Sequence, residues 1–356
     1  MSDDYKWRYD LEEYIKQGEP ERVEKSYAWQ TAIGLQDVDG LKTSDYLLVT
    51  AKEHIEGKIS IETAKSRIQS YYKQCDKRTE VECPTEEADT VSVRIAELLS
   101  EKTFQFSPAE LCSIHKRLFS GIIKNAGQYR TYNITKNEWV LNGKTVYYAS
   151  YDSIKDTLEY YFEQEKLFSY QGISAEDAIK HISKFTSGIW QIHPFCEGNT
   201  RTTAVFTIKY LKTFGFNISN DVFANNSWYF RNALVRANYN DLTNSVHATT
   251  AFLDKFFDNL IMNGTHDLKN RFLHIDYDKV QSANKSVSKC KNCTLEEMAI
   301  IKIMKDDPTA TQKIIAELTG KSERWVKSRT VQMQKKGLIA RENGKRNGKW
   351  VVLVDE

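Results

Sequence analysis

The residues best suited to chemistry lie in one stretch, QIHPFCEGNTRTT (191–203). The stretch shows neither the helical spacing of apolar residues nor the strand alternation that would bury it. It separates two segments with helical periodicity, so we expect a loop that ends one helix and begins the next. Its chemically useful groups are His193, Glu197, Gly198, Asn199 and Arg201.

In such a loop these groups suit phosphate chemistry. A helix beginning near Asn199 offers unpaired N–H groups to an anion, Gly198 permits close backbone approach, and Arg201 adds donors for phosphate oxygens. Glu197 would repel a bare phosphate unless a divalent cation such as Mg²⁺ lay between them. His193 alone in the stretch titrates near neutrality and can take a proton from an attacking hydroxyl.

Each residue also has a simpler interpretation. His193 could be a hydrogen-bonded loop histidine, Asn199 an ordinary helix N-cap, and Arg201 a solvated side chain. A zinc site built on His193 and Glu197 would need further ligands that the sequence does not supply. The concentration of all these groups in nine positions favours the phosphate interpretation.

The composition is that of a soluble globular protein, with 40% apolar residues, 28% charged residues and a net charge of +2. The chain contains no apolar run of about 18 residues, and its polar N-terminus has no apolar signal region. Six scattered cysteines are too few for a disulfide framework, and the CxxC pair Cys290–Cys293 is better explained by free thiols than by zinc. We therefore expect a cytoplasmic protein with no membrane partner.

The fold class expected is mainly α. The chain divides into an N-terminal helical region (1–85), a large unit (86–270), a polar linker (271–293) and a C-terminal unit (294–356). Apolar residues three or four apart predict helices in six segments of the large unit. These segments are 91–102, 107–123, 151–168, 174–192, 200–216 and 227–239.

One segment of the large unit differs. In NEWVLNGKTVYYAS (137–150), Asn142–Gly143 lies between two short runs of apolar and β-branched residues. An Asn–Gly pair in this setting predicts a β-hairpin with a two-residue turn.

The C-terminal unit predicts a winged helix-turn-helix. Helices begin at Thr294, Thr311 and Ser322, and two short strands follow around a Gly-rich basic tip. The basic side chains suit DNA phosphates, although dimerisation or protein docking remains an alternative. Those side chains are Arg324, Lys327 and Arg329 on the third helix and Lys345, Arg346 and Lys349 in the wing.

The run His193-Pro194-Phe195-Cys196-Glu197-Gly198-Asn199-Thr200-Arg201 resembles the Fic family signature H-x-F-x-[D/E]-G-N-G-R-x-x-R. Upstream, Ala126-Gly127-Gln128-Tyr129-Arg130 is similar to the family's AGxYR segment, and the 137–150 hairpin stands where the family keeps its flap. The resemblance covers about residues 86–250. It implies a Fic-type helical core with a β-hairpin flap.

The resemblance also implies an adenylyltransferase that moves AMP from ATP to a Ser, Thr or Tyr hydroxyl of a target protein, with Mg²⁺. His193 would be the general base and Glu197 the Mg²⁺ ligand. The nucleotide would be held by Gly198, Asn199, the backbone of Thr200 and Arg201, with Tyr229 near its base. Phe195 would anchor the loop, and the target would bind along the 137–150 hairpin.

The sequence departs from the signature at Thr200, in place of the third glycine, and at Ala204, in place of the final arginine. In the family that arginine grips the terminal phosphates and pairs with an inhibitory glutamate of a [S/T]-x-x-x-E-[G/N] helix. No Glu-[Gly/Asn] pair here has Ser or Thr four positions earlier. The segment 56–72 resembles the family's antitoxin-like helical module, and we expect it to be structural.

Two alternatives to protein adenylylation stay open. The chain could be a weakly active Fic scaffold that serves mainly as a DNA-binding regulator. It could instead keep the fold and catalyse phosphoryl or another nucleotidyl transfer. A homodimer is compatible with each.

Overall fold

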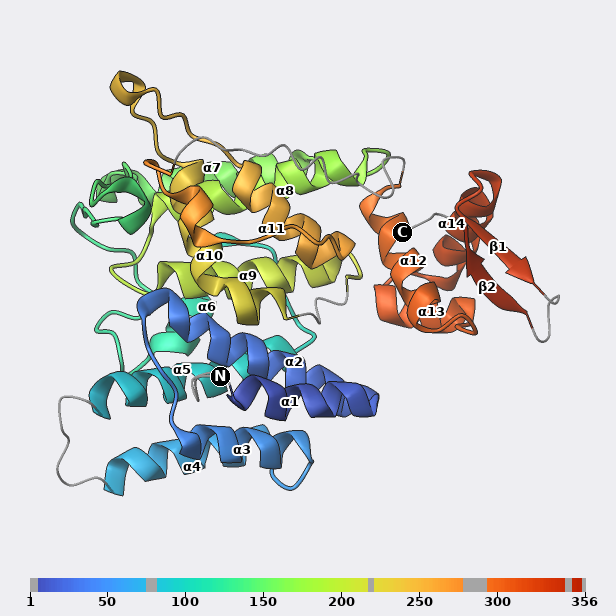
Figure 1. Ribbon diagram of the computed structural model, residues 1–356, viewed down its shortest axis with the longest axis horizontal. Helices are drawn as coiled ribbons and strands as arrows, with labels where there is room; N and C mark the ends of the chain where they lie inside the picture. The colour runs from blue at the N-terminus through green and yellow to red at the C-terminus, as the bar shows by residue number, and fades with distance from the viewer. Residues whose placement is uncertain (1–5, 75–81, 217–220, 278–292, 343–347, 354–356) are drawn as a thin grey trace.

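The computed structural model describes residues 6–74, 82–216, 221–277, 293–342 and 348–353. Most of the described chain is helical (Figure 1). The N-terminal helices are α1 (Lys6–Gln17), α2 (Pro20–Gly34), the 3-10 helix η2 (Leu35–Asp39), α3 (Asp45–Ile55) and α4 (Ile61–Gln74). The large unit contains α5 (Glu82–Ser100), α6 (Pro108–Phe119), η3 (Trp139–Leu141), η4 (Tyr151–Ser153), α7 (Ile154–Leu167), α8 (Ala175–Ile192), α9 (Asn199–Thr213), α10 (Val222–Ala237), η5 (Leu242–Asn244), α11 (Ala251–Met262) and η6 (Asn270–Leu273).

The six helices predicted in the large unit are all present, as α5 to α10. Their starts follow the expected capping chemistry, since the side chains of Ser107 and Ser174 accept hydrogen bonds from the third residue of α6 and α8. The helix α11 was not singled out from the sequence. Its apolar residues form one buried stripe that includes Leu253, Phe256 and Leu260.

The N-terminal helices share one hydrophobic core with the large unit. Buried side chains of both regions, such as Trp29 and Phe206, belong to the same cluster, and α2 packs along α5 (Figure 1). Gly34 makes the contact with α10 possible, because a Cβ there would lie 2.4 Å from the carbonyl oxygen of Ala224. The helix α5 runs through residue 85, where the sequence suggested a boundary.

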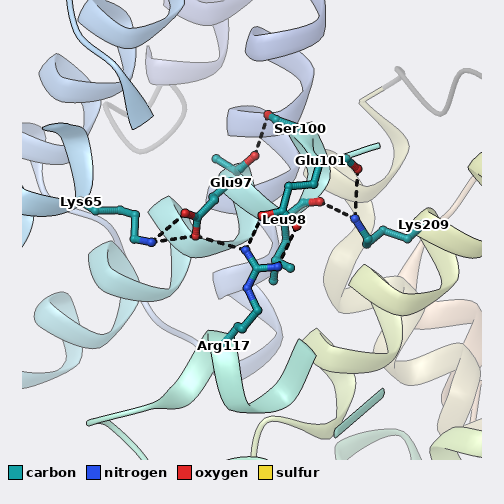
Figure 2. Close-up of polar contacts among 8 residues, drawn as sticks. Lys65, Glu97, Leu98, Ser100, Glu101, Arg117 and Lys209 are labelled. Atoms are coloured by element: carbon teal, nitrogen blue, oxygen red, sulfur yellow. Dashed lines mark hydrogen bonds and ion pairs between the residues drawn. The ribbon is translucent and has the colours of Figure 1, made fainter. Parts of the chain in front are cut away.

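Charged side chains near the C-terminal end of α9 join helices of the large unit to one another. Lys209 donates to the carbonyls of Leu98 and Glu101, at 2.8 and 3.1 Å, where α5 ends and its last carbonyls lack helical partners (Figure 2). Beside them Arg117 of α6 pairs with Glu101 at 2.5 Å. The Lys209 bonds hold α9 against the end of α5, and the first residues of α9 belong to the 191–203 stretch.

The predicted hairpin at 137–150 is only half right. Asn142 and Gly143 form the turn, with φ of 55° and 79°, and Lys144 donates to the carbonyl of Leu141 at 3.1 Å. The flanking strands are absent from this described segment, and Trp139–Leu141 is a 3-10 helix. Val140 and Leu141 are consecutive and both fully buried, whereas a strand would point them to opposite faces. We call residues 137–150 the flap.

The segment after α11 also differs from the expected linker. Leu273 is buried in the main core, and the backbone of Ile275 donates to the carbonyl of Val140 in the flap at 3.0 Å. Residues 278–292 lie outside the described part, as does Cys290. Cys293 is buried and disulfide-bonded, so the free thiol expected there is wrong.

The described residues between 293 and 353 form three helices and a small antiparallel sheet (Figure 1). Most of their buried side chains form a second core, while Leu295 and Ala299 belong to the main core. Thr294, Thr311 and Ser322 cap the three helices as expected. The strands pair with Ile339 opposite Val352 and Glu342 opposite Lys349. The elements are α12 (Leu295–Asp306), α13 (Gln312–Thr319), α14 (Glu323–Lys335), β1 (Ile339–Glu342) and β2 (Lys349–Val352). Among the described residues no helix is long and apolar enough to cross a membrane.

Candidate active site

His193 ends α8 in the left-handed conformation, with φ 50° and ψ 60°. Its Nδ1 lies 3.2 Å from the carbonyl of Trp190. Because a carbonyl can only accept, Nδ1 carries the proton and Nε2 keeps its lone pair. Nε2 is buried without a hydrogen-bond partner. Burial lowers the pKa of His193 well below its usual value, so the ring is neutral near pH 7 and Nε2 is unprotonated.

The backbone around His193 is held by Arg130, the last residue of the AGxYR segment. Its Nε donates to the carbonyl of His193 at 2.8 Å and its Nη2 to that of Ile192 at 3.3 Å. The backbone N–H of Arg130 donates to the carbonyl of Pro194 at 2.8 Å. Arg130 is almost completely buried. Its guanidinium binds the carbonyls of Ile192 and His193 and its backbone N–H binds that of Pro194, in place of the helical bonds that these carbonyls lack after α8 ends.

A second support, His115 on α6, was not identified from the sequence. Its Nδ1 accepts from the N–H of Gly127 at 2.7 Å, so its Nε2 carries the proton and donates to the carbonyl of Glu197 at 3.0 Å. The ring stacks on Phe195 at 3.8 Å. Burial lowers the pKa of His115 to about 4, which keeps this tautomer neutral. No motif at His115 reveals this role, because its partners are more than ten residues away.

The anion site predicted at the start of α9 has the expected backbone. Gly198 is the N-cap, with φ 71°, and no side chain caps the helix. Asn199 is therefore not the N-cap of the simpler interpretation. Its amide instead donates to the carbonyl of Phe195 at 2.8 Å and accepts from that residue's N–H at 3.0 Å. The first-turn N–H groups of α9 thus remain available to an anion.

Gly198 is also required by packing. A Cβ at this position would lie 2.4 Å from Cε2 of Phe119. Thr200, which replaces the third glycine of the signature, follows in the helix, and its Oγ1 accepts from Nε1 of Trp190 at 3.0 Å. The threonine therefore adds a bond between α8 and α9.

Arg201 is placed differently from the open phosphate ligand that we expected. Its guanidinium donates to Glu87 of α5 at 2.7 Å and to Gln36 at 3.0 Å, and it pairs with Asp39 at 2.9 Å. It also lies over the ring of Phe119 at 4.8 Å. The side chain is 3% exposed, so its guanidinium is buried against Gln36, Asp39 and α5.

The remaining positions considered for the site, Glu197, Ala204 and Tyr229, lie in different surroundings. Glu197 has an exposed side chain beside the anion site. Ala204 is fully buried and brings no charge to the site. Tyr229 lies in the core between α10 and α11, where its hydroxyl donates to the carbonyl of Phe252 at 3.3 Å, and none of its described contacts reaches the His193 loop.

The donor set limits the metal chemistry. Among the described residues no three His, Cys, Asp or Glu side chains gather around one point. Glu197 could hold a divalent cation only together with oxygens from substrate and water, which is how Mg²⁺ binds beside phosphates.

Side chains of the flap lie over the histidine. The rings of Tyr148 and His193 are 4.3 Å apart, and the Tyr148 hydroxyl donates to Oε1 of Glu138 at 3.3 Å. Glu138 is fully buried and pairs with Arg231 of α10 at 2.7 Å. The neighbouring carbonyl of Tyr147 accepts from Nε2 of Gln191 at 3.1 Å.

Residues 105–211 match the family model described as the Fic/DOC family. The chain is also similar to the crystal structure of a Fic family protein from Desulfovibrio desulfuricans G20, over 99% of its own length and 96% of that chain, with 11% identity and a TM-score of 0.44. No curated protein matches the chain. The matched residues 105–211 contain the whole His193 loop together with Arg130 and His115, so the region of the candidate site is the region similar to the Fic/DOC family.

Proposed function

We propose that this protein transfers AMP from ATP to a Ser, Thr or Tyr hydroxyl of a target protein. The observation that carries the proposal is the neutral His193 with a free Nε2, five residues before an uncapped helix N-terminus. A base for a hydroxyl and a site for an anion then lie at the two ends of one loop. The match to the Fic/DOC family supports the same reaction class.

The reaction balances with this chain's own groups. Nε2 of His193 takes the proton of the target hydroxyl, whose oxygen attacks the α-phosphorus of ATP. The bond from that phosphorus to the bridging oxygen breaks, and pyrophosphate leaves. The N–H groups of Gly198, Asn199 and Thr200 stabilise negative charge on the phosphates. Mg²⁺ beside Glu197 would neutralise further phosphate charge.

The target would bind beside the flap. A groove of about 590 Å³ separates the flap from the loop after α10, and Lys144, Tyr147, Asp241 and Leu242 are among its lining residues. Tyr147 is 83% exposed and Leu242 is 74% exposed. The two apolar side chains and the Lys144–Asp241 pair suit an amphipathic segment of a protein better than a small molecule. Because the flap has no strand, this binding would rest on side chains rather than on an added strand.

The test is incubation with Mg²⁺ and a candidate target mixture, using ATP labelled at either the α- or the γ-phosphate. We expect protein-bound label from the α-phosphate alone, lost in His193→Ala and kept in the exposed-histidine control His247→Ala. Label from the γ-phosphate alone would indicate phosphoryl transfer instead. No label from either position, with folded protein and target present, would contradict both reactions.

We further propose that residues 294–356 bind DNA as a winged helix-turn-helix, with α14 as the reading helix. Arg324 and Lys327 are exposed on α14, and Lys349 is exposed on β2. Arg329 does not contribute, because it pairs with Glu296 at 3.5 Å and with Glu297 at 3.8 Å. Lys345 and Arg346 lie outside the described residues.

This second proposal is tested on the full chain with duplex DNA at several salt concentrations. Each lost phosphate contact should reduce the slope of log K against log salt by about 0.9. The double variant Arg324→Ala/Lys327→Ala should lose nearly two such contacts, and the exposed pair Lys166→Ala/Lys184→Ala should lose none. An unchanged slope in the α14 variant, or no binding by the wild type, would exclude α14 as the reading helix.

A further inference from the structure

His193 presents a geometric conflict with the proposed reaction. A general base must come within about 3 Å of the hydroxyl oxygen that it deprotonates. His193 is only 2% exposed and its Nε2 is buried. The side chain of Tyr148 lies against its ring at 4.3 Å and is itself partly exposed. Tyr148 therefore covers part of the His193 ring on the side of the flap.

The backbone that carries Tyr148 is fixed on both sides. The carbonyl of Tyr147 accepts from Gln191 at 3.1 Å, and the carbonyl of Ala149 accepts from Arg130. Gln191 belongs to the 191–203 stretch, and Arg130 binds the backbone carbonyl of His193. A movement of the whole flap would break these bonds, so uncovering His193 in that way is costly.

The hydroxyl of Tyr148 is held more weakly than this backbone. Its hydroxyl makes one bond, to Glu138 at 3.3 Å, which is long for an O–H donor. Glu138 does not depend on this bond, because Arg231 pairs with it at 2.7 Å. Rotation of the tyrosine would leave the Glu138–Arg231 pair intact. It would give up one hydrogen bond, the ring contacts with His193 and Trp190, and packing of the partly buried ring against the main core.

We propose that the Tyr148 side chain is a gate over His193, which swings away on a fixed backbone to admit the target hydroxyl to Nε2. The proposal rests on the function proposed above, since it names the step that exposes the base. Substrate binding then competes with the closed position of the ring. Removing the ring removes this competition and raises kcat/KM, by about tenfold where the closed form is favoured by about 1.4 kcal/mol.

The decisive measurement needs no transfer activity. Diethyl pyrocarbonate acylates neutral, accessible histidines, and peptide mass spectrometry of the full chain gives the rate at each one. We expect wild-type His193 to react at less than about a tenth of the rate of exposed His247. Tyr148→Ala should accelerate His193 about tenfold or more, and Tyr147→Ala, an exposed neighbour, should not.

His115 serves as the internal control for folding. It is fully buried behind the loop, away from the flap contact, and it should stay protected in every variant. Tyr148→Leu, which keeps an apolar side chain, replaces Tyr148→Ala where that variant exposes His115. Rapid acylation of wild-type His193, or an unchanged rate in the variant that keeps His115 protected, overturns the gate. Absence of adenylylation with an accelerated His193 would contradict the proposed function and leave the gate standing.

Discussion

The two ends of the loop between α8 and α9 are stabilised in opposite ways. At the His193 end, Arg130, His115 and Asn199 bind backbone groups, and the atom that could react, Nε2, is left without a partner. At the Arg201 end the reactive side chain itself is bound, by Glu87, Asp39 and Gln36. The first arrangement leaves the Nε2 atom of His193 unbonded. The second binds the guanidinium of Arg201 and so joins the N-terminal helices to the large unit.

This difference changes the interpretation of the signature. A residue that matches a motif in sequence can still have its donors used inside the protein. Nε2 of His193 has no hydrogen-bond partner and no side chain caps α9 at Gly198, whereas the guanidinium of Arg201 contacts Glu87, Asp39 and Gln36. We therefore expect the largest mutational costs where the backbone of the His193 end is supported, and smaller ones among the partners of Arg201.

The largest expected effect is that of Arg130→Ala. The change leaves the carbonyls of Ile192 and His193 buried without donors, and it should lower the free energy of unfolding by about 3–5 kcal/mol. Urea denaturation gives the value. Arg130→Lys keeps the charge without the fork and should recover only part of the loss.

The variant Arg22→Ala is the control for Arg130→Ala, since Arg22 is partly exposed and pairs with the exposed Glu19. It should change the free energy of unfolding by less than about 0.5 kcal/mol. A similar cost for Arg22→Ala and Arg130→Ala would contradict the assignment of Arg130 as the main support.

A second experiment compares two glycines with nearly the same backbone conformation. Gly198 has φ 71° and Gly57 has φ 75°, but an added Cβ meets Phe119 at the first and nothing within 4 Å at the second. Gly57→Ala should cost about 1 kcal/mol through left-handed strain alone. Gly198→Ala should cost about 3 kcal/mol, because the clash adds to the strain.

Gly198→Ala should also reduce AMP transfer, since it shifts the first N–H groups of α9, while Gly57→Ala should leave transfer unchanged. Denaturation and the α-phosphate assay measure the two effects separately. Equal stability losses at the two positions would mean that Phe119 moves aside and that Gly198 is required for its conformation alone.

Features that depend on interactions between residues close in the sequence could be predicted, whereas features that depend on distant residues could not. Helix starts at Ser107, Ser174 and Thr294 depend on bonds across three residues, so the sequence reveals them. The Asn142–Gly143 turn is equally local. The sequence does not reveal that the flanking residues form no strands. Val140 and Leu141 are both buried because they pack in the main core near segments much later in the chain, such as α10 and Ile275.

The same limit applies to the candidate site. The positions of His193, Glu197 and Gly198 follow from a contiguous motif. The role of His115 depends on a bond to Glu197, 82 residues away, and that of Arg201 on Gln36, 165 residues away. Tyr229 was expected near the nucleotide, but its spacing is equally that of a buried helix face, and its described contacts are those of the core.

The smallest expected effect tests the Arg201 end directly. In Glu87→Gln the amide oxygen can still accept from the guanidinium, and Asp39 and Gln36 keep their contacts. The free energy of unfolding should therefore fall by only about 1 kcal/mol, against no measurable change in the exposed control Glu163→Gln. A loss as large as that of Arg130→Ala would show that the carboxylates around Arg201 act as one indivisible network. In that case stability would depend equally on the partners of both ends of the loop. The proposed difference between the His193 end and the Arg201 end would then be wrong.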